Sequence, residues 1–106
     1  MRRSASAAPL FAALGDEVRL RLVARLCREG PLSITHLTAG SHVSRQAVTK
    51  HLRVMEQAGL MRSTRRGRES HWQLDPHRLD HARRYLDQIS SQWDDALARL
   101  RRFVED

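Results

Sequence analysis

The sequence predicts a mainly helical domain with one small β-hairpin and a long last helix. Apolar residues recur every three or four positions in most segments of the 106-residue chain. Two short strand-like runs flank a glycine turn at residues 66–69, and residues 76–104 carry one uninterrupted apolar stripe. With 41% hydrophobic residues, a chain of this length can form one packed core.

The N-terminal part is expected to hold an arm and two helices. Residues 1–9 are small, polar and alanine-rich, which predicts a mobile arm. A short helix begins with Pro9 and ends at Gly15. Asp16 is placed to cap a second helix that runs to about Glu29.

Two further helices with a glycine-containing turn between them form a helix-turn-helix pattern. Ser33 can cap the first, which carries Ile34 and Leu37. Ser44 can cap the second, which ends near Gly59. In this pattern the second helix is the one that enters the major groove of DNA.

A β-hairpin follows and would form a wing beside these helices. Its strands are expected over residues 59–65 and 70–74, with Gly67 in the turn and with Trp72 and Leu74 facing the helices. The tip of the hairpin carries three arginines, Arg65, Arg66 and Arg68. Arginines in such a place can enter a minor groove or contact phosphates.

The last helix is expected to begin at Pro76, with Asp75 as its cap, and to reach Val104. A domain of this size cannot cover its whole apolar stripe and the first helix too, so we expect a second copy to cover the remainder. The residues expected at this interface are Leu10, Phe11, Leu14, Leu79, Leu86, Ile89, Trp93, Leu100 and Phe103. A long helix that folds back on its own core is the alternative.

The positive charge is concentrated in one part of the chain. The net charge is +7, and residues 44–69 hold seven basic and two acidic side chains, whereas residues 76–106 are balanced. A concentrated positive charge indicates a polyanionic partner, most often nucleic acid, and a solvated basic face without a partner is the alternative.

The second helix of the helix-turn-helix presents a polar face suited to DNA. Five polar side chains share an arc of about 140°: Arg45, Gln46, Thr49, Lys50 and Arg53. Arg45 can pair with guanine, Gln46 with adenine, and the methyl group of Thr49 with thymine. Ser44 and Lys50 suit phosphates.

The sequence offers little support for other classes of function. We expect no catalytic site and no cofactor, because no nucleophile–base–acid set and no phosphate-binding glycine loop is present. No run approaches the about 18 apolar residues that span a membrane.

His77 and His81 could share a metal, but surface positions are favoured, and His51 is expected to be partly buried. Cys27 lies on an apolar face, which predicts a core position, and a single cysteine favours the cytoplasm.

Residues 11–20, 43–52, 56–60 and 66–69, followed by 72–76, resemble the ArsR family of bacterial winged-helix repressors. The resemblance implies a homodimer joined by its first and last helices, with one recognition helix in each major groove and the wings alongside. It places DNA contacts at Ser44, Arg45, Gln46, Thr49, Lys50 and the wing arginines Arg65, Arg66 and Arg68.

The chain departs from the metal-sensing relatives. Its third helix has no cysteine, and the zinc and nickel pattern that begins at His77 would continue at Gln88 and Ser91. We therefore expect a repressor without a metal site, which binds double-stranded palindromic operators as a homodimer. Residues 10–75 would form the DNA-binding domain and 76–106 the dimerisation helix. A zinc- or nickel-responsive repressor and a winged-helix module for protein or RNA are the alternatives, and a small-molecule effector is left open.

Overall fold

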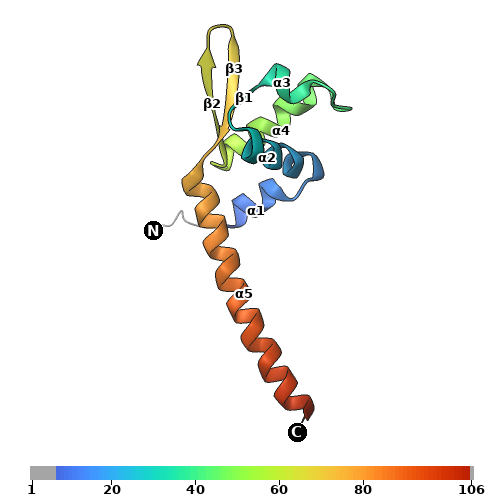
Figure 1. Ribbon diagram of the computed structural model, residues 1–106, viewed down its shortest axis with the longest axis vertical. Coiled ribbons are helices and arrows are strands. Elements are labelled where there is room, and N and C mark those ends of the chain that lie inside the picture. Colours follow the sequence, from blue (N-terminus) through green and yellow to red (C-terminus); the bar gives the residue numbers. More distant parts are fainter. Residues whose placement is uncertain (1–6, 106) are drawn as a thin grey trace.

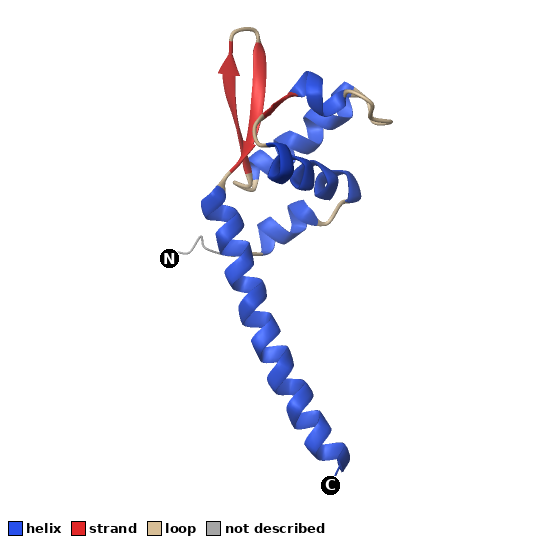
Figure 2. Cartoon of the chain, in the orientation of Figure 1, coloured by secondary structure: helices blue, strands red, loops and turns tan. Residues whose placement is uncertain are grey.

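The computed structural model of the protein describes residues 7–105 (Figure 1). In that part of the chain the helices are α1 (Ala8–Leu14), α2 (Glu17–Glu29), α3 (Ile34–Thr38), α4 (Arg45–Gln57) and α5 (Pro76–Glu105). The strands are β1 (Leu32–Ser33), β2 (Met61–Arg66) and β3 (Glu69–Leu74), drawn in red in Figure 2. The predicted class is confirmed: a mainly helical fold with a hairpin wing and a long last helix.

The molecule is elongated because α5 projects from the winged domain formed by the other elements (Figure 1). Its overall dimensions are 66 × 36 × 20 Å. The alternative in which the last helix folds back on its own core is therefore wrong. Residues 1–6 of the expected N-terminal arm lie outside the described residues, and α1 begins at Ala8, one residue before its expected start.

The described strands form one antiparallel sheet in the order β1-β3-β2. β2 and β3 are the predicted hairpin, with Arg66 opposite Glu69 at the tip. Gly67 has a φ of 62° in the turn, a conformation that other residues rarely adopt. β1, in which Leu32 lies opposite Trp72, was not predicted. Two residues are too few to show an alternating pattern.

The predicted caps of the helices are confirmed. Asp16, Ser33 and Ser44 each accept a hydrogen bond at 3.1 Å from a backbone N–H three residues ahead. Asp75 accepts one from the N–H of His77 at 2.9 Å. These bonds satisfy N–H groups that have no partner inside the helix and so set where each helix begins.

One hydrophobic core joins the first four helices, the sheet and the start of α5. Leu52 and Met55 of α4 and Leu60 after it are completely buried, and Trp72 of β3 is 6% exposed. Leu74 packs against the same core, so both wing residues that were expected to face the helices do so. This packing fixes the rotation of α4 about its own axis.

Two sequence-based expectations about burial are wrong. Leu10 is completely buried in the core of its own chain, so it is not available for a dimer interface. The short helix α1 turns Leu10 and Ala13 inward and leaves its other side outside. Cys27 is exposed, because it follows the buried Leu26 by about 100° around α2 and so leaves the apolar face.

Candidate nucleic-acid interface

Helix α4 presents one continuous polar face to solvent. Its buried residues all lie on the side that packs against the core. The exposed side chains on the other side are Arg45, Gln46, Lys50 and Arg53, with the exposed Ser44 at the start of the helix. Thr49 is partly buried at the border of this face. The structure therefore brings the sequence-predicted helix residues together, with Thr49 the least accessible of them.

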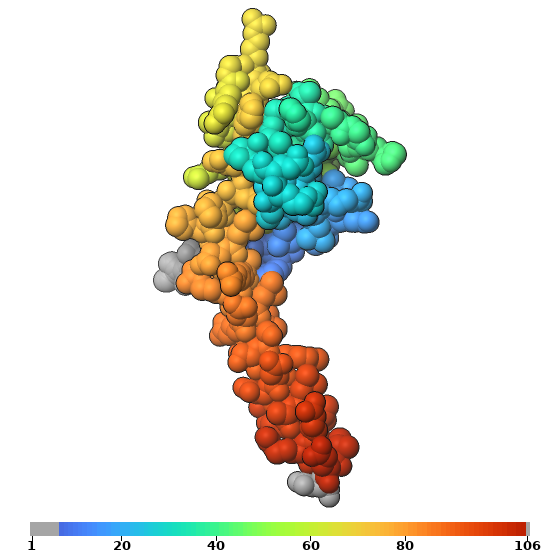
Figure 3. All heavy atoms as spheres, in the orientation of Figure 1, coloured from blue at the N-terminus to red at the C-terminus, as the bar shows by residue number. Residues whose placement is uncertain are grey.

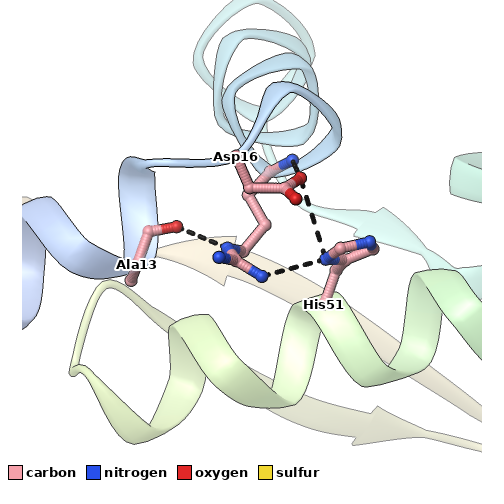
Figure 4. Close-up of polar contacts among 4 residues, drawn as sticks. Ala13, Asp16 and His51 are labelled. Carbon is pink, nitrogen blue, oxygen red and sulfur yellow. Dashed lines mark hydrogen bonds and ion pairs between the residues drawn. The ribbon is translucent and has the colours of Figure 1, made fainter.

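A polar network holds the middle of α4 against the start of α2 (Figure 4). Arg19 Nη1 lies 3.1 Å from His51 Nδ1, and Arg19 Nε donates to the carbonyl of Ala13 at the end of α1. Asp16 Oδ1 lies 3.9 Å from His51 Nδ1. His51 is partly buried and has polar neighbours, as the sequence predicted.

The pKa of Asp16 is lowered within this network. The largest cause is the hydrogen bond from the backbone N–H of Arg19 to its carboxylate, which favours the charged form. Partial loss of hydration opposes this lowering of the pKa, whereas the Arg19 guanidinium and a protonated form of His51 favour it. Asp16 is thus both the cap of α2 and the anionic member of the network that holds α4 against α2.

The wing extends beyond the body of the winged domain, as the space-filling view shows (Figure 3). The three predicted wing arginines are all exposed, and so is Arg62 on β2, which sequence reasoning did not single out. Arg65 Nε donates to the carbonyl of Gly67 at 3.4 Å, which holds that side chain along the turn. The wing therefore presents guanidinium groups along its length as well as at its tip.

Two carboxylates tie the wing to the helices. Ser63 of β2 donates to Glu56 of α4 at 3.4 Å, and Thr35 of α3 donates to Glu69 of β3 at 3.2 Å. Glu56 and Glu69 are the two acidic residues of the basic segment 44–69. Sequence reasoning counted their charge but could not assign their partners, because these contacts join separate elements.

The apolar stripe of α5 is largely uncovered within one chain. Only its first turns pack on the winged domain, where Ala82 is buried and Leu79 contacts the core. The ring of Phe11 lies 5.6 Å from that of Tyr85, which joins α1 to α5. Beyond that point the large apolar side chains are exposed: Leu86, Ile89, Trp93, Leu97, Leu100, Phe103 and Val104.

The described residues show no grouping that indicates metal binding within one chain. Three or more His, Cys, Asp or Glu side chains that could hold a metal ion do not come together anywhere between residues 7 and 105. His81 instead lies with its Nδ1 3.4 Å from Nη1 of Arg78. In the same part of the chain no helix is both long and apolar enough to cross a membrane.

A helix-turn-helix flanked by a basic wing, with a polar face on its second helix that carries no acid before Glu56, defines a winged-helix domain of the kind found in transcriptional regulators. Comparison with known proteins agrees. A family model described as a helix-turn-helix domain, HTH_20, matches residues 14–64. The chain is 36% identical over 93 residues to the HTH-type transcriptional regulator Rv2034 of Mycobacterium tuberculosis, which covers 88% of this chain and 83% of that protein.

It is also 33% identical over 92 residues to the transcriptional repressor SmtB of the same organism, covering 87% of this chain and 66% of SmtB. A solved structure of an ArsR-like transcriptional regulator from Rhodococcus sp. RHA1 superimposes with a TM-score of 0.73 at 35% identity, covering 91% of this chain and 90% of that one. The chain belongs to the ArsR family of winged-helix transcriptional regulators.

The regulators of this family bind DNA and are not enzymes. The chain spans about half to two thirds of some curated relatives. It covers 52% of the arsenic resistance transcriptional regulator ArsR1 of Pseudomonas putida, compared with 66% of SmtB.

Proposed function

We propose that this protein is a cytoplasmic transcriptional repressor that binds palindromic double-stranded operators as a homodimer. The observation that carries the proposal is the exposed face of α4, which holds basic and amide side chains and no acid before Glu56. Ordinary protein surfaces mix charges of both signs. Beside this face lies a wing of exposed arginines, so one side of the domain can contact both grooves and the phosphates.

The roles of the side chains follow from their chemistry and position. Arg45 and Gln46, near the start of the exposed face, are suited to read base edges in the major groove, and Thr49 can contact a thymine methyl group from its border. The remaining residues supply backbone affinity: Ser44, Lys50, Arg53, Arg65, Arg66 and Arg68.

The pattern of α5 supports an antiparallel homodimer centred on Trp93. In such a pair, residue 93+n of one chain faces residue 93−n of the other. Leu86 then faces the partner's Leu100, and Ile89 faces the partner's Leu97, so exposed apolar side chains meet along the seam. Asp87 faces the partner's Arg99, which pairs opposite charges.

In this dimer the length of α5 sets a separation between the two winged domains that is on the order of one turn of DNA. Leu79, in the first turn of α5, lies 14 residues from Trp93, so the two winged domains would begin about 42 Å apart along the seam, at about 1.5 Å per residue. Successive major grooves on one face of DNA are about 34 Å apart. The same register brings the partner's Phe103 opposite Arg83, and α1 contacts the same part of α5 through the rings of Phe11 and Tyr85.

Binding to the DNA upstream of the protein's own gene, measured across a salt series, tests the proposal. A dimer that neutralises about 6–10 phosphates should lose about 10³–10⁵ in affinity between 50 and 200 mM salt. Arg45→Ala should lower the preference for the operator by about 1–3 kcal/mol per site, whereas Arg66→Ala should weaken all sequences alike and reduce the salt slope. Arg84→Ala, on the exposed side of α5, is the matched control.

A salt-independent affinity would refute the assignment to DNA. Equal effects of Arg45→Ala and Arg66→Ala on sequence preference would refute the division between base reading and phosphate contact. Binding to single-stranded RNA with no preference for a symmetric duplex would favour an RNA-binding module.

A further inference from the structure

The C-terminal end of the recognition helix α4 is closed by the loop that follows it. The N–H of Leu60 donates to the carbonyl of Met55, and that of Gly59 to the carbonyl of Glu56, both at 2.9 Å. With Gly59 at a φ of 81°, this is a Schellman cap. The cap does not include the carbonyl of Ala58. The last turn of α4 also has no basic residue to offset the negative end of the helix dipole.

Arg78, in the first turn of α5, completes this end of α4. Its Nη2 donates to the carbonyl of Ala58 at 3.2 Å. Its side chain also covers Gly59, since a Cβ added there would lie 3.0 Å from Arg78 Nε. A second bond joins the residues next to these two helix ends, because the N–H of Asp75, just before α5, donates to the carbonyl of Leu60, just after α4, at 2.8 Å. The start of α5 is therefore fastened to the end of α4.

The guanidinium of Arg78 is turned toward the protein and not toward a DNA surface. The residue is partly buried. Across residues 7–105, no carboxylate forms an ion pair with it. Its other side-chain contact places Nη1 3.4 Å from His81 Nδ1. The wing arginines, by contrast, are exposed.

We propose that Arg78 is a positioning residue for DNA recognition. Because its side chain joins the end of α4 to the start of α5, Arg78 couples the orientation of the recognition helix to the orientation of α5. The two copies pair through α5. The proposal rests on the function proposed above and adds a route by which the dimer geometry controls base reading. A change in how the α5 helices pair would reach the base-reading face through this contact.

The test compares Arg78→Met and Arg78→Lys with wild type, using fluorescence anisotropy on the operator and on an unrelated duplex of equal length across a salt series. We expect Arg78→Met to weaken operator binding about tenfold, as expected for a lost charge-assisted hydrogen bond. Binding to the unrelated duplex, the salt slope and the dimer dissociation constant should stay unchanged. Arg78→Lys keeps the charge at the helix end and should recover part of the loss.

Arg84→Met is the matched control, because Arg84 lies on the same helix, its side chain is 74% exposed, and it pairs with Asp80 at 3.1 Å. It should leave operator preference unchanged. If Arg78→Met weakens both duplexes equally and lowers the salt slope, Arg78 is a phosphate contact and the proposal is overturned. Unchanged operator binding by Arg78→Met overturns it as well. If Arg78→Met does not fold, the same comparisons on Arg78→Lys decide the matter.

Hydrogen exchange in the free protein separates this proposal from the proposed function. The backbone N–H groups of Gly59 and Leu60 should exchange faster in Arg78→Met than in wild type and Arg84→Met, because the loop that carries their hydrogen bonds loses the Arg78 contact to the carbonyl of Ala58 and opens more often. Unchanged exchange there would overturn the capping role. If wild type shows no preference for any duplex, the DNA-binding function fails, while the exchange result still reports on Arg78.

Discussion

Trp93 is the residue whose replacement should most directly separate the two copies of the protein. Its side chain is 64% exposed in the single chain, at the middle of the apolar stripe of α5. In the proposed antiparallel pair it faces its own copy. Trp93→Ala therefore removes the largest contact at the centre of the interface from both chains at once.

The size of the effect follows from the exposed area. A tryptophan buries about 150–250 Å², so the exposed part of Trp93 offers about 130 Å² to a partner. At about 25 cal/mol per Å², this corresponds to about 3 kcal/mol per chain. Alanine retains part of the contact, and area converts incompletely into affinity. We therefore expect a loss of about 4 kcal/mol for the pair, which is about a thousandfold weaker dimer.

Sedimentation velocity over a concentration series would measure this change. Dilution of wild type should also shift the fluorescence of Trp93 toward that of an exposed indole, while the buried Trp72 stays constant. Asp94→Ala, the next residue along the helix, is the control and should leave the dimer intact. A Trp93→Ala variant that dimerises as tightly as wild type would refute the proposed interface between the two α5 helices.

Two further outcomes concern stability. Leu52→Ala should lower the free energy of unfolding by about 2–5 kcal/mol in urea melts followed by circular dichroism, because Leu52 is completely buried in the core, and a loss below about 1 kcal/mol would contradict that packing. Asp16→Asn should make the melting temperature depend less steeply on pH in the acidic range. The pKa of Asp16 is lowered in the folded protein, so its charge stabilises the fold above its unfolded pKa of about 3.8, and this contribution is lost as the pH falls through the lower folded value. Melting temperatures of wild type and Asp16→Asn measured from pH 6 to pH 2 would check this. If the melting temperatures of both proteins fall equally with pH, Asp16 does not have this role.

Most of the candidate DNA interface could be predicted because its signals are local. The caps at Asp16, Ser33 and Ser44 depend on hydrogen bonds three residues apart, and the split of α4 into core and solvent faces depends on its periodicity. Gly67 marked the turn of the wing in the same way. Each of these features is decided within one or two turns of the chain.

The remaining features depend on contacts between distant segments. Leu32 forms a strand because Trp72 lies beside it, 40 positions later. Glu56 and Glu69, which sequence reasoning treated only as charges, bind hydroxyl groups on neighbouring elements. Arg78 is one of several arginines in the sequence, and only the approach of α5 to the end of α4 gives it a capping contact.

The sequence by itself determined the class of fold, the helix boundaries, the basic face and the long apolar stripe. The tertiary structure decided which apolar residues are left over for a partner: it buries Leu10, exposes Cys27 and projects the stripe of α5 away from the core. The physical reason is that periodicity and capping act over a few residues, whereas burial depends on which elements pack together. A sequence shows that a side chain is apolar, and only the packed fold shows whether its own chain already covers it.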